Sequence, residues 1–414
     1  MATKDVTKFE IPEGSIFKKL SYILSFIGAG SVLMSEAMGP GTATSCVTAG
    51  AQFGYMLLWI IVLSGIMNGV VAYIGGKMAV LSGKNAYEYI KDNTSQWFAN
   101  GLIIIVLITW YLVIFSQGAT IKHLTDIMFG SKFSTPAFII TVLAIGYIFA
   151  SGKNRVIAIA SAMCTAMAVI YLINAIYIKP DPVQLVNGLV PRLPSIDKAV
   201  IVAGIIGGSA PGTSALWYSY SVKDNKWKGP KALNYIAWDQ IYFAFLFTIF
   251  SIGIYLSGAA VLHPAGIQVN SALDAAKAIG PLAGEMGKWI FVLGLWGAVF
   301  TTIGGMSSLG SYAINSIFKM GESLNDQKVK RITWVGIILS LFGGMVKGNV
   351  LGLLVYFLGL LNVGGFVLIS LLTYYTSSEK HAGEYKNKWY ITLIGIVICG
   401  FNFYAVLTYI QRFL

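Results

Sequence analysis

Long apolar runs separated by short polar connections dominate the chain. About twenty consecutive apolar residues are enough to cross a bilayer as a helix, and eleven segments reach or approach that length. The expected spans lie near residues 19–51, 54–81, 98–122, 134–151, 155–178, 198–221, 233–262, 287–316, 331–347, 350–375 and 389–411. The pattern predicts an all-α polytopic membrane protein that forms a single transmembrane domain over residues 1–414, with 1–18 as a polar tail.

Two of these spans are interrupted by the same four-residue pattern. The first break reads Gly39-Pro40-Gly41-Thr42, and the second reads Ala210-Pro211-Gly212-Thr213. Each break opens a run of five spans, and one further span follows at 389–411. Helix breakers at corresponding places in two halves of a membrane protein point to a transporter binding site near the bilayer midplane. The alternative is that Pro-Gly only kinks two packed helices, and the matched positions favour the binding site.

A break in a spanning helix has electrostatic consequences. Freed backbone groups must face protein or a water-filled cavity, because lipid cannot satisfy them. The first half-helix ends with partial negative charge, and the second half begins with partial positive charge. Thr42, Thr44, Ser45, Thr213 and Ser214 would supply hydroxyl groups at the positive ends. The sequence therefore predicts a site for a small polar solute or an ion.

Composition and charge agree with the spans. Hydrophobic residues make up 56% of the 414 residues and charged residues only 11%, which is typical of an integral membrane protein. The net charge of +12 needs no nucleic-acid partner, since 20 of the 29 Lys and Arg fall on one side of the predicted topology. By the positive-inside rule we expect a plasma-membrane protein with a cytoplasmic N-terminus and an extracytoplasmic C-terminus. No cleavable signal peptide is expected, because the first 16 residues lack an apolar core.

The chain lacks the motifs of the common enzyme classes. There is no HExxH, GxSxG or Walker A pattern, and the three histidines are scattered. No soluble segment is long enough for a nucleotide-binding domain. We therefore expect a secondary transporter rather than an enzyme or an ATP-driven pump. It would use no cofactor beyond H⁺ or Na⁺ as a coupling ion, and its partners would be the bilayer and a small-molecule substrate, without an obligate protein partner.

The residues around the first break resemble those of the Nramp family of divalent-metal transporters. Met38-Gly39-Pro40-Gly41-Thr42 is followed by Ala49-Gly50-Ala51-Gln52-Phe53-Gly54-Tyr55, as DPGN is followed by AGAQFGY in that family. Lys179-Pro180-Asp181-Pro182 is similar to the loop before its sixth span. The resemblance implies a LeuT-type fold of two inverted repeats, 19–178 and 198–375, with spans one and six broken.

The same comparison shows where the chain departs from the family. Gly39, Thr42 and Ala210 stand where the resemblance implies a metal-binding Asp, Asn and Met. Gly212 and Trp217 stand at the positions of two histidines. The side chains that form the family's metal site are thus replaced, and no metal site of that kind is expected.

Proton coupling is affected as well. In span three the resemblance places Leu107, Ile114 and Gln117 at acidic positions of the family's proton route. Glu36, one turn before the first break, is our candidate for proton coupling or for pairing with a substrate ammonium; a neutral, hydrogen-bonded Glu36 is the alternative. Asp239 is expected near the cytoplasmic surface.

The sequence leaves three hypotheses for function. The first is import of a small organic solute, such as a carboxylate or an amino acid, because helix N-termini suit anionic groups. The second is transport of a divalent metal, largely hydrated, with charge supplied by Glu36. The third is a receptor-like protein that does not transport. The candidate substrate-binding residues are Gly39, Gly41, Thr42, Ser45, Ala210, Gly212, Thr213, Ser214, Trp217 and Asn362. Asn362 has a second interpretation, a structural hydrogen bond between helices.

Overall fold

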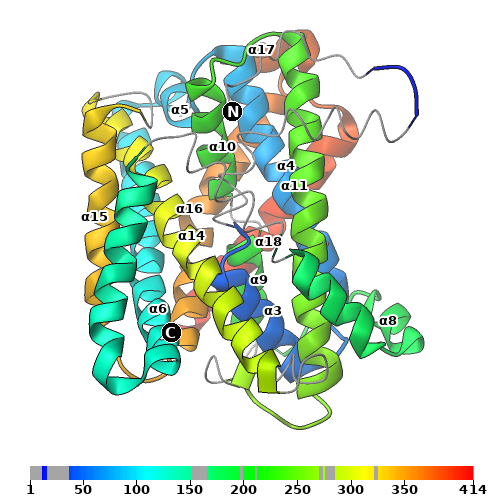
Figure 1. Cartoon of the computed structure of the whole chain (residues 1–414). Helices are drawn as coiled ribbons and strands as arrows, with labels where there is room; N and C mark the ends of the chain where they lie inside the picture. The colour runs from blue at the N-terminus through cyan, green and yellow to red at the C-terminus, as the bar shows by residue number, and fades with distance from the viewer. Residues whose placement is uncertain are drawn as a thin grey trace.

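The computed structural model describes residues 12–15, 37–151, 166, 168–195, 199–209, 212–269, 274–275, 285–320 and 325–413. Glu36 and Ala210 lie outside these residues. The helices are α3 (Pro40–Phe53), α4 (Leu58–Ser82), α5 (Ala86–Asn93), α6 (Gln96–Phe149), α8 (Pro182–Gly188), α9 (Ala199–Ser209), α10 (Thr213–Asp224), α11 (Pro230–Ser257), η3 (Gly258–Leu262), α14 (Glu285–Phe318), α15 (Gln327–Gly343), α16 (Val350–Ser377), α17 (Glu379–Ala382), η5 (Gly383–Tyr385) and α18 (Trp389–Phe413). Figure 1 shows most of them as roughly upright columns.

Seven helical stretches in the described part of the chain are long and apolar enough to cross a membrane. Their positions follow the hydrophobic pattern closely, with one difference in span three. That span was expected to end near residue 122, whereas the helix continues to Gly130 before the next stretch begins at Lys132. Gly130 has φ 67° and ψ 176°, a conformation that glycine adopts without a steric penalty. It turns the chain without an extended loop.

The helices form two groups that meet at the broken spans. In the first group, α4 packs extensively against α10 and α11, and α11 also contacts α3. In the second group, α6, α14 and α15 pack against one another. Helix α16 lies between the groups and contacts α6, α9, α10 and α18. The broken spans are thus enclosed by helices from both groups.

Small residues bring these helices close together. A Cβ atom at Gly75 of α4 would lie 1.9 Å from the backbone oxygen of Ala215 in α10. A Cβ atom at Gly118 of α6 would lie 1.8 Å from the oxygen of Ser340 in α15. Such approaches are typical of membrane helices, whose association depends on close van der Waals packing.

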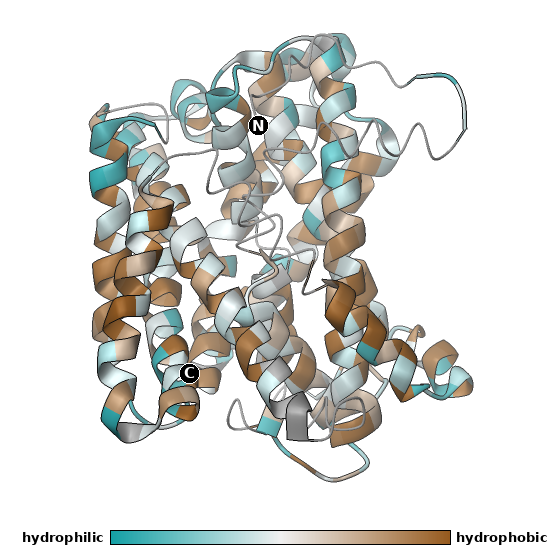
Figure 2. Cartoon of the chain, in the orientation of Figure 1, coloured by the Kyte–Doolittle hydropathy of each residue, from teal (hydrophilic) through white to brown (hydrophobic). Residues whose placement is uncertain are grey.

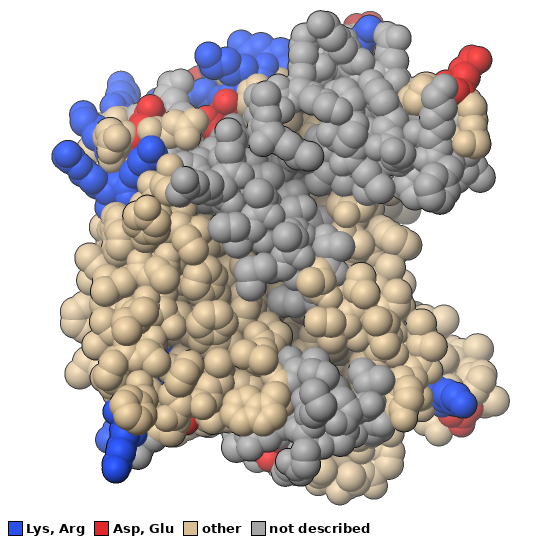
Figure 3. Space-filling model, in the orientation of Figure 1, with Lys and Arg blue, Asp and Glu red and all other residues tan. Residues whose placement is uncertain are grey.

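The two ends of the molecule differ in charge. Hydrophobic residues dominate the middle of the ribbon, and hydrophilic residues gather toward its ends (Figure 2). Lys and Arg concentrate at the end that carries α5 and α17 (Figure 3). We call this end the α5 face and the opposite end, near α8, the α8 face.

Candidate functional site

The two breaks present helix N-termini to the interior. Helix α3 starts after Gly39 and α10 after Gly212, and neither N-terminus has a side-chain cap. The two helices run in opposite directions from the middle of the molecule (Figure 1). The N–H groups of their first turns therefore carry partial positive charge into the protein interior. This arrangement matches the one that the repeated Pro-Gly predicts.

Thr42 connects the two breaks directly. Its Oγ1 lies 2.6 Å from the carbonyl oxygen of Ala37 and 3.0 Å from that of Gly208, near the C-terminal end of α9. The hydroxyl proton is shared between these two carbonyls, so Thr42 can offer a ligand only its oxygen lone pairs. Thr42 thus holds the start of α3 against the end of α9.

Helices α16 and α18 support the second break. A Cβ atom at Gly212 would lie 1.8 Å from the backbone oxygen of Gly365, and the N–H of Gly212 donates to Oδ1 of Asn402 at 3.4 Å. Gly212 has φ −51° and ψ −17°, values open to any residue, so space rather than backbone conformation calls for glycine here. Asn402 was not predicted as a site residue, since nothing in its own span marks it.

The side-chain amide of Asn362 donates hydrogen bonds through its nitrogen, while its oxygen accepts none within the described chain. Its Nδ2 donates to the carbonyl oxygen of Gly359 at 2.9 Å and to that of Ala203 in α9 at 3.3 Å. Its Oδ1 is buried and accepts no hydrogen bond from the described residues. Asn362 therefore holds α16 against α9, the structural role that the sequence left open, and keeps a free acceptor.

Several predicted site residues have polar atoms without a partner. Ser45 Oγ, Thr213 Oγ1, Ser214 Oγ and Trp217 Nε1 are buried and make no hydrogen bond within the described chain. Leaving such a group unpaired costs about 1–3 kcal/mol. Four buried polar groups near the breaks thus have no hydrogen-bond partner within the described chain.

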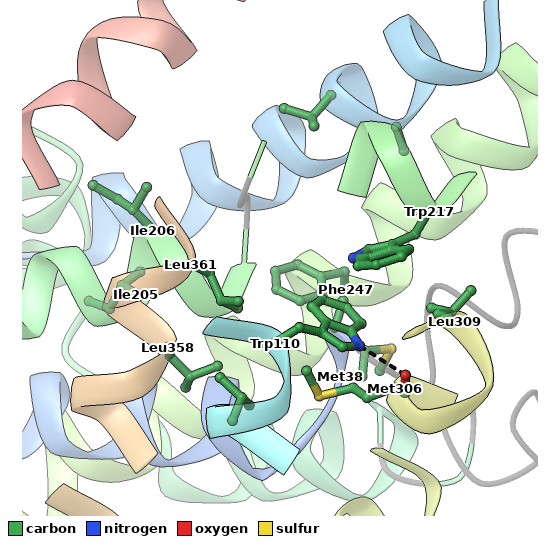
Figure 4. Close-up of a cluster of buried hydrophobic side chains, with 14 of the residues drawn as sticks. Met38, Trp110, Ile205, Ile206, Trp217, Phe247, Met306, Leu309, Leu358 and Leu361 are labelled. Carbon is green, nitrogen blue, oxygen red and sulfur yellow. Dashed lines mark hydrogen bonds between the residues drawn. The ribbon is translucent and has the colours of Figure 1, made fainter. Parts of the chain in front are cut away.

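These residues do not all belong to one cluster. Ser45 lies beside α9, with its Oγ 3.5 Å from the position of a Cβ on Gly204. Trp217 instead faces α6, where its ring packs on Trp110 with centroids 4.4 Å apart (Figure 4). Trp110 is fixed by a hydrogen bond from its Nε1 to the backbone oxygen of Met306 at 2.8 Å. The hydroxyls of α3 and the indole of α10 thus reach different sides of the breaks.

Aromatic rings continue from Trp217 toward the α5 face. The ring of Trp217 stacks on that of Tyr220 with centroids 6.3 Å apart, and the ring of Tyr220 stacks on that of Tyr312 with centroids 5.5 Å apart. Both tyrosines line a pocket of about 440 Å³, together with Lys91 and Lys223. The column of rings separates the breaks from this pocket.

A second pocket lies toward the α8 face. It has a volume of about 560 Å³ and is lined by Thr44, Thr48 and Gln52 of α3 and by Asn349 and Tyr356 near the start of α16. The breaks thus lie between two pockets at opposite ends of the molecule, as a site that opens alternately to each side requires.

Asp239, expected near the cytoplasmic surface, is buried between neighbouring helices. It is 3% exposed and accepts a hydrogen bond from the hydroxyl of Tyr218 at 2.6 Å. Helix α11 begins at Pro230, so Asp239 lies more than two turns inside it. This buried carboxylate links α11 to α10, directly after the second break.

The donor set does not resemble a conventional metal site. No group of three or more His, Cys, Asp or Glu side chains lies together among the described residues. Two buried methionines, Met38 and Met306, belong to the cluster around Trp110 (Figure 4). Their thioethers pack there among apolar side chains. Among the described residues, the candidate side-chain ligands around the breaks are hydroxyls, an amide and an indole.

Comparison with known proteins shows the family to which the chain is related. It matches the family model "Natural resistance-associated macrophage protein-like" (Nramp) over residues 30–410. The divalent metal cation transporter MntH of Bacillus subtilis is 25% identical over 405 residues, which cover 93% of this chain and 92% of the relative. MntH of Vibrio campbellii is 24% identical over 395 residues, covering 93% and 91%.

Solved structures share the fold. A crystal structure of the Eremococcus coleocola manganese transporter superposes with a TM-score of 0.77 at 18% identity, covering 97% of this chain and 88% of that one. The structure of Mhp1, a nucleobase-cation-symport-1 family transporter, superposes with a TM-score of 0.59 at 14% identity, covering 93% of this chain and 89% of that one. The predicted LeuT-type fold is confirmed, as is the expectation of a transporter rather than an enzyme. The chain belongs to the Nramp family of multi-pass membrane transporters.

Proposed function

We propose that this transporter moves a divalent metal ion that keeps most of its water shell. Membership of the Nramp family supports a metal substrate, as do relatives that are named divalent metal cation transporters. The unpaired oxygens at the breaks support the hydrated form. Neutral hydroxyl and amide oxygens compensate a bare dication poorly in a low-dielectric interior, but they accept hydrogen bonds from its bound water.

The donor chemistry also indicates which metals suit the site. Softer transition metals favour thiolate, thioether or imidazole ligands, whereas Mg²⁺ dehydrates reluctantly and commonly keeps several waters. Ser45, Thr213, Ser214 and the Oδ1 of Asn362 are matched to such a shell. We therefore infer a preference for hard cations, with Mg²⁺ or Mn²⁺ as the probes of choice.

Charge compensation would come from two sources. The C-terminal carbonyls of α9 carry partial negative charge toward the break, and Gly208 already accepts a hydrogen bond there from Thr42. Glu36, which lies outside the described residues, is the proposed carboxylate, and H⁺ or Na⁺ is the proposed coupling ion. Buried Asp239 is a second candidate for coupling.

A small organic carboxylate is the second candidate substrate. The two uncapped helix N-termini and the unpaired N–H of Trp217 favour an anionic group. Gly39, in place of a larger side chain, leaves room for it. In either case we propose that the α5 face is cytoplasmic, because Lys and Arg concentrate on that face. We further propose that the membrane is the plasma membrane.

Thermal stability of the purified protein separates these candidates. Ligands that bind only the folded state raise the melting temperature with concentration. We expect Mg²⁺ and Mn²⁺ to stabilise the protein and a panel of organic acids to leave it unchanged. Stabilisation by an organic acid alone would favour the second candidate. No response to either class would favour the receptor-like alternative.

A further inference from the structure

A groove apart from both breaks opens between α4 and α11. It has a volume of about 820 Å³, and the connection between α17 and α18 closes it at the α5 face. Ile66 and Val70 of α4 and Ile241 and Ala244 of α11 form apolar walls, and Lys77 lies at the polar end. The two pockets beside the breaks share none of these lining residues. The groove is therefore a separate candidate site.

Lys77 is a buried cation without an ionic partner. It is 4% exposed, and its Nζ donates to Oδ1 of Asn387 at 2.8 Å. The ring of Tyr73 lies 5.9 Å from the same nitrogen. No carboxylate in the described part of the chain pairs with Lys77, although buried charges are normally paired. The ammonium thus retains hydrogen-bonding capacity and an uncompensated charge at the groove.

Asn387 holds this ammonium in place. Its Nδ2 donates to Thr376 Oγ1 at 2.8 Å, and its backbone N–H donates to the carbonyl oxygen of Thr376, also at 2.8 Å. These bonds leave Oδ1 free to accept from Lys77. The position of the ammonium is fixed by a connected network and does not depend on one flexible side chain.

Two acidic groups lie near the groove, and one of them is paired with a lysine. Glu379 accepts from Lys386 at 2.8 Å, and this bond lowers the pKa of the Glu379 carboxyl. The nearby carboxylate of Glu384 raises the pKa of the Tyr385 phenol. Lys388 also lines the groove and is exposed. Glu384 also lines the groove, but Lys77 and Lys388 outnumber it, so the lining presents a net positive charge to an occupant.

Side-chain types place the groove across the membrane boundary. Trp389 is 77% exposed and Tyr390 44% exposed at the start of α18, and exposed Trp and Tyr are enriched at the level of lipid headgroups. Ile66 and Ile241, along the walls, are 48% and 55% exposed. The polar end thus lies at headgroup level and the apolar walls at acyl-chain level.

We propose that this groove binds an anionic phospholipid. The phosphate pairs with Lys77 and Lys388, and one acyl chain lies between α4 and α11 against the isoleucines. Basic pockets between transmembrane helices are suited to anionic headgroups. The apolar walls commit the site to a lipid, since a free phosphate would leave them uncovered.

The test measures lipid binding to the purified full-length protein in neutral detergent. Native mass spectrometry and melting temperature are recorded during titration with phosphatidylglycerol, phosphatidylcholine and soluble glycerol phosphate. We expect phosphatidylglycerol to bind and stabilise at concentrations where the other two do neither. Equal binding of the two lipids, or equal stabilisation by glycerol phosphate, would overturn the proposal.

Variants locate the site. Lys388→Gln, an exposed change, should weaken phosphatidylglycerol binding about fivefold, the effect of roughly 1 kcal/mol for one basic residue near a lipid surface. Lys328→Gln changes an exposed lysine at the start of α15, away from the groove, and should leave the affinity unchanged. Lys77→Gln is the second groove variant. Unchanged affinity in Lys388→Gln, or an equal loss in Lys328→Gln, would contradict the assignment.

Discussion

Thr42 shows how much a single residue contributes to the site. From its sequence position alone it is a hydroxyl at a helix N-terminus and a direct ligand candidate. In the structure its proton is shared between Ala37 and Gly208, so its first role is to hold two half-helices together. This contact depends on the approach of α9 to α3, which hydrophobic periodicity does not encode.

Replacing Thr42 tests that role. Thr42→Val keeps the side-chain shape but leaves two buried carbonyls without their donor, which should lower the free energy of unfolding by about 1–3 kcal/mol. Thr42→Ser retains the hydroxyl and should stay close to the parent protein. Melting temperatures of the three proteins in one detergent check this, and equal stability of Thr42→Val and parent would rule out the link.

The Tyr218–Asp239 hydrogen bond gives a second residue-scale prediction. Because the bond joins α10 to α11 in a buried setting, Tyr218→Phe and Asp239→Asn should each destabilise the protein. The double variant should cost less than the sum of the two, by about 0.5–3 kcal/mol. A double-mutant cycle on the free energy of unfolding measures this coupling. Simple additivity would show that the two groups act independently.

At the scale of helices, hydropathy predicts the position of most spans, whereas tertiary contacts set some helix ends and the burial of polar residues. Spans such as 350–375 and 389–411 correspond to α16 and α18 within two residues at each end, because apolar length is the dominant signal. The extension of the third span to Gly130, within α6, and the burial of Asp239 were not predicted. Both depend on where a helix begins or ends in the packed bundle. Polar residues near the ends of a span are a poor guide to that position.

The second break depends on close packing between α10 and α16. Gly212→Ala would push a methyl group against the carbonyl oxygen of Gly365, so we expect misfolding or loss of transport. Gly101→Ala is the matched control, since a Cβ atom there meets nothing within 4 Å and alanine favours a helix by about 1 kcal/mol. Size-exclusion profiles and flux compare the two. Full activity of Gly212→Ala would show that this contact is not required.

At the scale of the whole molecule, the breaks lie between pockets at opposite ends. In a background without the native cysteines, we expect Lys91→Cys to react with a membrane-impermeant maleimide only from the cytoplasm. Thr48→Cys, in the opposite pocket, should react only from outside. Labelling of intact cells and inverted vesicles checks both. Reaction of Lys91→Cys from outside would reverse the proposed orientation.

The fold of the whole chain was predictable because the repeated Pro-Gly and the AGAQFGY stretch survive in it. The substrate was less predictable than the fold, because Gly39, Thr42 and Ala210 replace the metal-binding side chains that the family resemblance implies. From this loss the sequence favoured an organic solute. Family membership and the unpaired neutral oxygens shift the balance toward a hydrated metal ion.

Metal flux into proteoliposomes tests this account most directly. With the purified protein reconstituted, we predict saturable uptake of Mg²⁺ or Mn²⁺ above that of empty liposomes. Uptake should fall at least tenfold in a Thr213→Ala, Ser214→Ala double variant that retains its fold, because the hydroxyls that bind the water shell are gone. Absence of divalent-metal uptake by a folded, correctly inserted protein, with uptake of an organic acid in its place, would contradict the account.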